Sequence, residues 1–301
     1  MSLALLLIAA LFAAFMVLLR LRWCPTIVMR IWFSMCILLV IVPAYIVCGA
    51  VNAAAKMNWM SKRRSESISC VVSYLLLGKV LLTLSPHIRV KVMKQSLGIK
   101  DFQDGGVMCA CHTSFFDTLL FLSLASLQYM HRAKALAKSA LWKVPLLGTV
   151  VEACGHLPVY FTSPDVDSFG VDKEKQAVIS VITDEFLTSQ GNLCIFPEGV
   201  MNRTPEVLRD FRFGTFNLIL RHGARVYYMA HCGCDRVWPP SLKGLPGFPA
   251  DIYVYFGSYE YAKDTTAKEL AAGLRQVMQK HLDNMIEQRR LDAGHGPSKT
   301  A

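Results

Sequence analysis

The stretch VMCACHTSFFDTLLFLSLASLQYM, residues 107–130, joins an unbroken apolar run to a short polar turn and a longer apolar segment. Residues 107–111 predict a strand buried on both faces, as strands of parallel sheets are. Residues 115–130 predict a helix that Thr113 or Ser114 can cap. His112 lies in the turn, and Asp117 follows five positions later in the first helical turn. The stretch therefore predicts the start of a βα unit with a polar turn at the carboxyl end of a buried strand.

Short apolar runs and amphipathic segments continue to alternate downstream. Helices are expected at 139–153 and at 172–189, where Val178, Ile182 and Phe186 share one helical face. Further strands are expected at 133–137, 157–161, 192–196, 224–230 and 252–256. The alternation predicts an α/β fold with a mixed central sheet flanked by helices.

The last helix has a clear start signal. Thr266 and Glu269 form a capping box, and apolar side chains keep helical spacing after it at Leu270, Leu274, Val277 and Met285. The residues from 291 to 301 are polar, and we expect a flexible tail there.

Two segments at the start of the chain, 1–19 and 31–55, contain no charged residue. Each is long enough to cross a bilayer, which takes about 20 apolar residues. A cleaved signal peptide is disfavoured because no basic residue precedes the first segment and Arg20 and Arg22 follow it. We predict two N-terminal membrane helices. A re-entrant hairpin is the alternative, because Pro43 interrupts the second segment and basic clusters flank it on both sides.

These features divide the chain into a membrane anchor at 1–64, a catalytic domain at 65–290 and the tail. Residues 68–84 are apolar apart from Lys79, so they predict either a helix at the membrane interface or a buried core helix.

The net charge is +10, and 53% of the residues are hydrophobic. Next to membrane segments, this charge favours anionic lipid headgroups or a polyanionic substrate as partners, and we expect no nucleic acid. The ten cysteines are scattered as in a protein with reduced thiols. Zinc ligation by Cys109 and Cys111 with His112, or by Cys232 and Cys234 with His231, is the alternative reading. Paired zinc thiolates prefer wider spacing, so we expect no metal.

His112 and Asp117 are residue types suited to proton transfer. A neutral imidazole accepts a proton near pH 7, and a carboxylate on its other nitrogen fixes the tautomer. The chain offers no obvious nucleophile, so the hypothesis is that His112 deprotonates a hydroxyl of the substrate. Ser114 as an acyl-carrying nucleophile remains the alternative. A histidine and an aspartate at this spacing also occur together by chance.

A second group of candidate residues lies in NLCIFPEGVMNRTPEVLRDFRFG, residues 192–214. A predicted strand ends at Phe196, and Gly199 in the following turn has no Cβ to obstruct a ligand. Three arginines follow, as a phosphate pocket would require: Arg203, Arg209 and Arg212. An ordinary strand–turn–helix with a solvated basic face is the alternative.

Four blocks, CHTSFFD (111–117), KALAKSALWKVPLLG (134–148), GHLPVYF (155–161) and FPEGVMNR (196–203), occur in an order and spacing that resemble the glycerolipid acyltransferase family. The closest likeness is to 1-acyl-glycerol-3-phosphate (lysophosphatidate) acyltransferases, over about residues 85–260. The resemblance implies a membrane-bound α/β enzyme with a histidine–aspartate dyad. It also implies acyl-CoA as co-substrate, a lysophospholipid acceptor and no cofactor.

On this resemblance, His112 is the general base and Asp117 its orienting partner. Glu198 and Gly199 belong to the acceptor or phosphate site. The remaining cationic positions of the family pattern fall on Lys138 and Arg212.

The chain also departs from the family pattern. Phe161 replaces a usual arginine, and Val200 and Met201 replace Thr-Arg after Pro-Glu-Gly, so Arg203 is the natural substitute for a missing phosphate ligand. These departures concern the acceptor headgroup more than the acyl transfer.

We therefore expect acyl transfer from acyl-CoA to lysophosphatidate, giving phosphatidate in phospholipid biosynthesis. The alternatives are an acceptor with another headgroup, a tafazzin-like transacylase independent of CoA, and a lipid-binding protein without catalysis. We expect an integral protein of the endoplasmic reticulum or another internal membrane, with its catalytic domain facing the cytosol. The sequence leaves the oligomeric state and the acyl-chain preference open.

Overall fold

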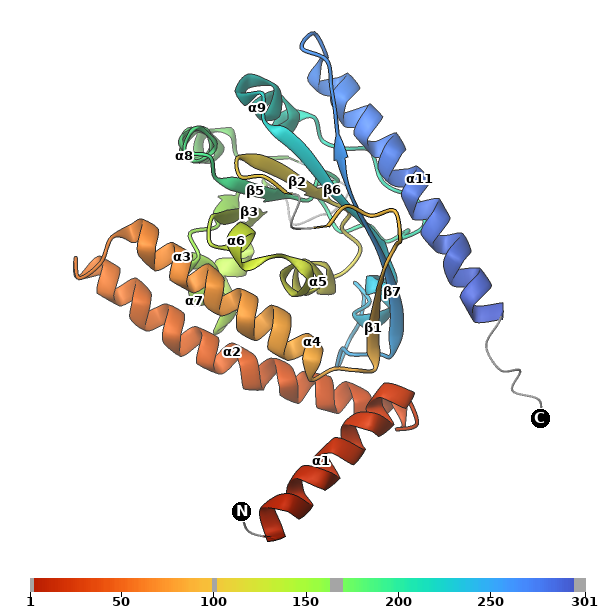
Figure 1. Ribbon diagram of the computed structural model, residues 1–301. Coiled ribbons are helices and arrows are strands. Elements are labelled where there is room, and N and C mark those ends of the chain that lie inside the picture. The colour runs from red at the N-terminus through yellow and green to blue at the C-terminus, as the bar shows by residue number, and fades with distance from the viewer. Residues whose placement is uncertain (1–2, 99–101, 163–169, 295–301) are drawn as a thin grey trace.

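The computed structural model describes residues 3–98, 102–162 and 170–294. Its centre is one seven-stranded sheet in the order β1–β7–β6–β2–β5–β3–β4 (Figure 1). All neighbouring strands are parallel except β6 and β7. The strands are β1 (Ile88–Val92), β2 (Gly106–Ala110), β3 (Ala133–Lys138), β4 (Leu157–Val159), β5 (Asn192–Ile195), β6 (Arg225–Cys232) and β7 (Ala250–Tyr259). The predicted mixed sheet is confirmed, and β1, which the sequence analysis missed, forms one edge.

Helices cover both faces of the sheet. They are α1 (Leu3–Leu21), α2 (Thr26–Lys56), α3 (Lys62–Ser73), α4 (Leu81–Thr83), α5 (Phe116–Leu124), α6 (Leu127–Met130), α7 (Leu147–Ala153), α8 (Lys173–Thr188), α9 (Gly214–His222), α10 (Cys234–Val237) and α11 (Ala267–Gly294). Met108 and Met229 face the core beneath α2, α5 and α7, whereas Cys109 and Ala230 face the core beneath α8, α9 and α11. Because both faces are covered, alternate residues of each central strand are equally apolar.

Two predicted helices are interrupted. The helix expected at 115–130 leaves helical geometry at Ala125 (ψ 158°) and restarts as α6, capped by the Ser126 hydroxyl, which accepts from Tyr129 N. The helix expected at 139–153 consists of a 3-10 turn at Ser139–Lys143 and then α7. Proline and a positive φ at Leu146 (63°) separate the two parts.

Helix α8 confirms the helix expected at 172–189, but the face that carries Val178 and Ile182 is not its buried side. The helix buries Ile179, Thr183 and Leu187, whereas Val178 is 62% exposed and Ile182 39%. Thr183 tolerates burial because its hydroxyl donates to the Ile179 carbonyl oxygen at 2.6 Å. Because this bond satisfies the hydroxyl group, burying Thr183 does not leave an unpaired polar group in the core.

Helix α11 confirms the predicted last helix. Thr266 Oγ1 accepts from Glu269 N, and the Glu269 carboxylate accepts from Thr266 N, as in a capping box. Leu270, Leu274 and Met285 are buried. The helix continues to Gly294, through the first four residues of the predicted tail. Residues 295–301 lie outside the described part of the chain.

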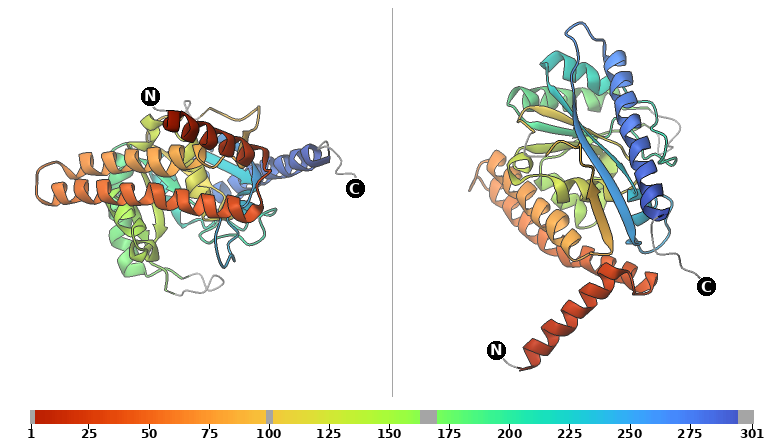
Figure 2. Two further views of the ribbon diagram at one scale, coloured as in Figure 1. Left: turned by 90° about the horizontal axis from the view of Figure 1, so that it is seen from below. Right: turned by 45° about the vertical axis from the view of Figure 1, so that its right-hand side comes forward.

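The first helix projects away from the sheet, and α2 runs along the body (Figures 1 and 2). Leu19 is the one buried residue of α1, and α2 continues as a helix through Pro43. Among the described residues, three helical segments are long and apolar enough to cross a membrane: Leu3–Leu21, Thr26–Lys56 and Lys62–Thr83.

The segment Lys62–Thr83 packs against α2 and α5. Gly78 permits the close approach to α5, because a Cβ there would lie 2.6 Å from the Leu122 carbonyl oxygen. Leu77 and Leu81 are buried, and Leu75 and Val80 on the same segment are exposed. The segment predicted at 68–84 therefore packs one side into the core, and part of its apolar surface remains exposed.

Candidate active site

The two residues of the predicted dyad are in contact. His112 follows β2, and its Nδ1 lies 3.0 Å from Asp117 Oδ2. Asp117 is fully buried, whereas the His112 side chain keeps 21% of its surface exposed. Because the carboxylate accepts a hydrogen from Nδ1, Nε2 carries the lone pair. The arrangement presents a proton acceptor at the carboxyl edge of the sheet.

Main-chain bonds hold the carboxylate in place. Asp117 Oδ2 also accepts from Thr113 N at 2.7 Å and from Ser114 N at 2.9 Å. The ring of His112 stacks on Phe196 with a centroid distance of 4.1 Å. The imidazole is therefore oriented on two sides, by an acid anchored to its own turn and by an aromatic ring at the end of β5.

Ser114 does not fit the role of an acyl carrier. It is fully buried, and its hydroxyl donates to Trp238 O at 2.7 Å and accepts from Phe116 N at 3.0 Å. Both bonds serve the start of α5 and its contact with the loop after α10. The structure thus favours the hypothesis in which the substrate supplies the nucleophile.

Glu198 connects the two groups of candidate residues, the turn that carries His112 and the segment after β5. It is fully buried, with Oε1 accepting from His112 N at 2.9 Å and Oε2 from Arg209 N at 3.0 Å. Burial raises the pKa of Glu198 above its ordinary value, and the two N–H groups counteract that shift. Its hydrogen-bond partners are these two main-chain N–H groups and the Asn202 side chain, so direct contact with an acceptor stays a prediction. Gly199 next to it has a φ of +74°, a conformation that favours glycine.

We expect Glu198→Gln to lower both stability and activity. One carboxylate oxygen becomes an NH2 group facing a main-chain N–H, so a buried donor loses its acceptor, which costs about 1–3 kcal/mol. Thermal unfolding of the purified protein in detergent measures the loss. Glu152→Gln is the control, because Glu152 is half exposed beside Lys56. Equal unfolding temperatures for the two variants would contradict this role of Glu198.

The loop after Gly199 is held by residues that sequence reasoning missed. Arg275 of α11 donates to Leu208 O at 2.7 Å, and Gln279 Oε1 accepts from Leu208 N, also at 2.7 Å. Arg212 N donates to Pro197 O at 2.7 Å. These contacts return the arginine-rich segment to the turn after β5. The two contacts from α11 join residues about 70 positions apart, for which no local sequence signal exists.

The remaining predicted cations also lie toward this edge. Arg203 and Arg212 are exposed on the loop, and Lys138 is exposed at the carboxyl end of β3, beside β5. Lys138 Nζ lies 5.9 Å from the ring centre of Phe161. The sheet therefore gathers the two halves of the predicted site at one edge.

The described residues contain one cluster of three potential metal ligands: Asp117, His231 and Cys234. This cluster differs from the two zinc sites considered in the sequence analysis, each of which combined a Cys-x-Cys pair with a histidine. Cys109 lies in the core, and the Cys111 thiol donates to His231 O at 3.7 Å. The cluster consists of a dyad residue and two buried neighbours.

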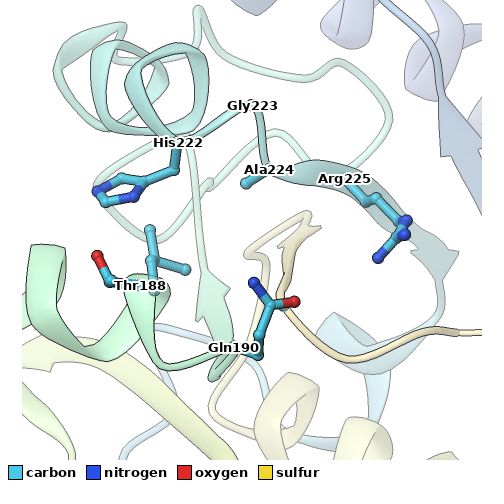
Figure 3. A pocket seen from close by; sticks show the side chains of 8 residues that line it. Thr188, Gln190, His222, Gly223, Ala224 and Arg225 are labelled. Atoms are coloured by element: carbon cyan, nitrogen blue, oxygen red, sulfur yellow. The ribbon is translucent and has the colours of Figure 1, made fainter.

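A pocket at the opposite, amino edge of the central strands is separate from the dyad. Figure 3 shows Thr188, Gln190, His222 and Arg225 around it. His222 Nε2 lies 2.7 Å from Asp184 Oδ1, so this edge also holds a histidine–carboxylate pair. The strand directions separate that pair from the edge that carries His112.

A histidine oriented by a buried carboxylate at the carboxyl edge of an α/β sheet has the geometry that a general base requires. Residues 88–231 match the family model described as Acyltransferase. The family resemblance seen in the sequence is confirmed.

One solved structure shows a similar fold. It is that of the 1-acyl-sn-glycerophosphate (LPA) acyltransferase PlsC from Thermotoga maritima, with a TM-score of 0.53 and 13% identity over 86% of this chain and 95% of that chain. No curated protein matches the sequence.

Proposed function

We propose that this protein transfers an acyl group from acyl-CoA to the free hydroxyl of lysophosphatidate, giving phosphatidate. The observation that supports this most is the contact between His112 Nδ1 and the buried Asp117 carboxylate. It leaves Nε2 as the proton acceptor at a partly exposed edge of the sheet. The match to the acyltransferase family model supplies the reaction type.

In the proposed step, His112 Nε2 takes the proton of the acceptor hydroxyl while the hydroxyl oxygen attacks the thioester carbonyl carbon. The tetrahedral intermediate collapses by breaking the carbon–sulfur bond. The CoA thiolate leaves and takes up the proton from His112. Asp117 stabilises the imidazolium that forms in between. A main-chain N–H at the start of α5, or a basic side chain, stabilises the oxyanion.

The exposed cations at the same edge are proposed to hold the acceptor phosphate. Arg203 is the first candidate, because guanidinium and phosphate groups form paired, charge-assisted hydrogen bonds. Arg212 and Lys138 extend the positive charge along the edge.

We expect Arg203→Ala to raise the Michaelis constant for the acceptor about tenfold, the effect of losing a charge-assisted hydrogen bond. The constant for acyl-CoA should change much less, and Arg203→Lys should fall in between. Steady-state kinetics with each substrate varied in turn measure the two constants. Arg221→Ala is the control, since Arg221 binds Asp184 near the amino edge. A larger effect on acyl-CoA would move the phosphate site elsewhere.

The apolar helices support membrane association, which would place the site where lysolipids partition. An internal membrane such as the endoplasmic reticulum, with the catalytic domain facing the cytosol, remains part of the proposal. So does the expectation that acyl-CoA is a co-substrate and that no cofactor or metal is needed. Stoichiometric zinc in active, purified protein would contradict the last point.

A thiol-release assay tests the function. Purified protein is given acyl-CoA with lysophosphatidate or with lysolipids bearing other headgroups, and transfer from phospholipid donors is followed without CoA. Release with lysophosphatidate is the expected result. Release only with another headgroup would change the acceptor, and transfer without CoA would favour the tafazzin-like alternative. No acyl transfer with any pair would contradict the proposed function.

A further inference from the structure

A second histidine lies behind the dyad. His231, near the end of β6, is fully buried, and its Nε2 is 3.4 Å from Asp117 Oδ1. The same nitrogen is 3.1 Å from Cys111 O. The pairing of β2 with β6 places the two strand ends side by side, with Ala110 opposite Met229. The dyad carboxylate therefore lies between two imidazoles, one at the surface and one in the core.

The surroundings of His231 determine which of its nitrogens carries hydrogen. Both neighbours of Nε2, the Cys111 carbonyl and the Asp117 carboxylate, are acceptors, so Nε2 must donate. Nδ1 is buried and has no hydrogen-bond partner among the described residues. A hydrogen on Nδ1 would therefore be left without an acceptor in the core, at substantial cost. The tautomer that fits these contacts has hydrogen on Nε2 and the lone pair on Nδ1.

The two carboxylate oxygens of Asp117 have different partners. Oδ2 takes His112 and the two main-chain N–H groups, whereas Oδ1 makes no hydrogen bond of ordinary geometry among the described residues. His231 Nε2, 3.4 Å from Oδ1, and the Cys234 thiol, which hydrogen-bonds Asp117, are the donors beside this carboxylate. Removing the His231 N–H would leave more unbalanced negative charge on the carboxylate that His112 contacts.

The Cys234 thiol also donates toward Asp117, and it is unchanged in every variant compared below. Burial raises the pKa of the Cys111 and Cys234 thiols well above the ordinary value and that of Cys232 to about 11, so the thiols remain neutral. Glu198 on the turn after β5 is bonded to main chain. Asp235 of α10 adds further negative charge next to Cys234.

We infer that His231 is a positioning residue that donates from Nε2 toward Asp117 Oδ1 and limits how strongly the carboxylate favours protonated His112. The inference rests on the proposed function for its kinetic consequence. Its effect on His112 can be measured without any substrate.

The matched variants are His231→Gln and His231→Asn. The glutamine amide reaches the position of the imidazole Nε2 and can donate there, whereas the asparagine amide reaches only the position of Nδ1. Loss of the donor should move the midpoint for protonation of His112 up by about half a pH unit in the asparagine variant, because one neutral hydrogen bond has about that effect. The glutamine variant should retain the wild-type midpoint.

The midpoint is measured as the pH dependence of His112 carbethoxylation by diethylpyrocarbonate, mapped by mass spectrometry. His87→Asn is the control, because His87 is equally buried and bonds through Nε2 to Gly247 O at 3.2 Å. The acid limb of kcat/KM should move with the same midpoint. Equal midpoints for the wild type and the asparagine variant would overturn the inference while leaving acyl transfer intact. Absence of transfer in the wild type would instead contradict the proposed function.

A measurement on the unaltered protein covers the case in which a variant does not fold. Nitrogen-15 chemical shifts of the His231 ring should show hydrogen on Nε2 and none on Nδ1 at neutral pH. The opposite tautomer, a cationic ring, or one equivalent of zinc bound through His231 would each overturn the inference.

Discussion

Replacing His112 with alanine is expected to reduce turnover by about three orders of magnitude, within the range for loss of a general base. Nothing else in the described site is placed to accept the hydroxyl proton from the same position. Folding should persist, because Asp117 Oδ2 keeps its bonds to Thr113 N and Ser114 N when the imidazole is removed. Initial rates of CoA release at saturating acceptor measure the effect.

His222→Ala is the matched control for this change. His222 also contacts a carboxylate, Asp184 at 2.7 Å, but lies at the amino edge of the sheet. The control should retain activity and lose at most some stability. Normal product formation by folded His112→Ala protein would end the assignment of the dyad.

The second large effect is expected for Asp117→Asn, which removes the charge but keeps an oxygen at the Oδ2 position. Thr113 N and Ser114 N both donate to Oδ2, so the asparagine oxygen should take that position and still accept from His112 Nδ1. The tautomer is preserved, but the imidazolium formed in the reaction loses its negative partner. A neighbouring opposite charge shifts such an equilibrium by about 1–3 pH units, so we expect roughly 100-fold slower turnover.

The pH dependence of kcat/KM shows in which direction the charge of Asp117 acts. Without the carboxylate charge, protonated His112 is disfavoured in the free enzyme, so the acid limb of kcat/KM should move to lower pH. Asp117→Ala is the comparison, because it also leaves two buried N–H groups without an acceptor and should unfold at lower temperature. An asparagine variant with unchanged rate and profile would show that the carboxylate has no electrostatic role.

Local features were predictable because their causes are local. The strands near 107–111, 192–196 and 224–230 were recognised because covering both faces of the sheet makes every residue apolar. The His112–Asp117 contact lies within one turn and the first residues of a helix, so the short spacing together with the four ordered blocks indicated it. The break at Ala125 and the buried face of α8 were not predictable in this way. Single hydroxyl groups, at Ser126 and Thr183, decided them through bonds to nearby main chain.

By itself, the sequence determined the class of fold and the apolar helices through hydrophobic periodicity, and it indicated the dyad through the order and spacing of four short blocks. Only the tertiary structure decided what surrounds that dyad. Glu198 reaches His112 across 86 positions and His231 reaches the carbonyl of Cys111 across 120. Those contacts exist because β5, β2 and β6 lie side by side and end at one edge. Strand order depends on packing among distant segments, and so no local pattern records it.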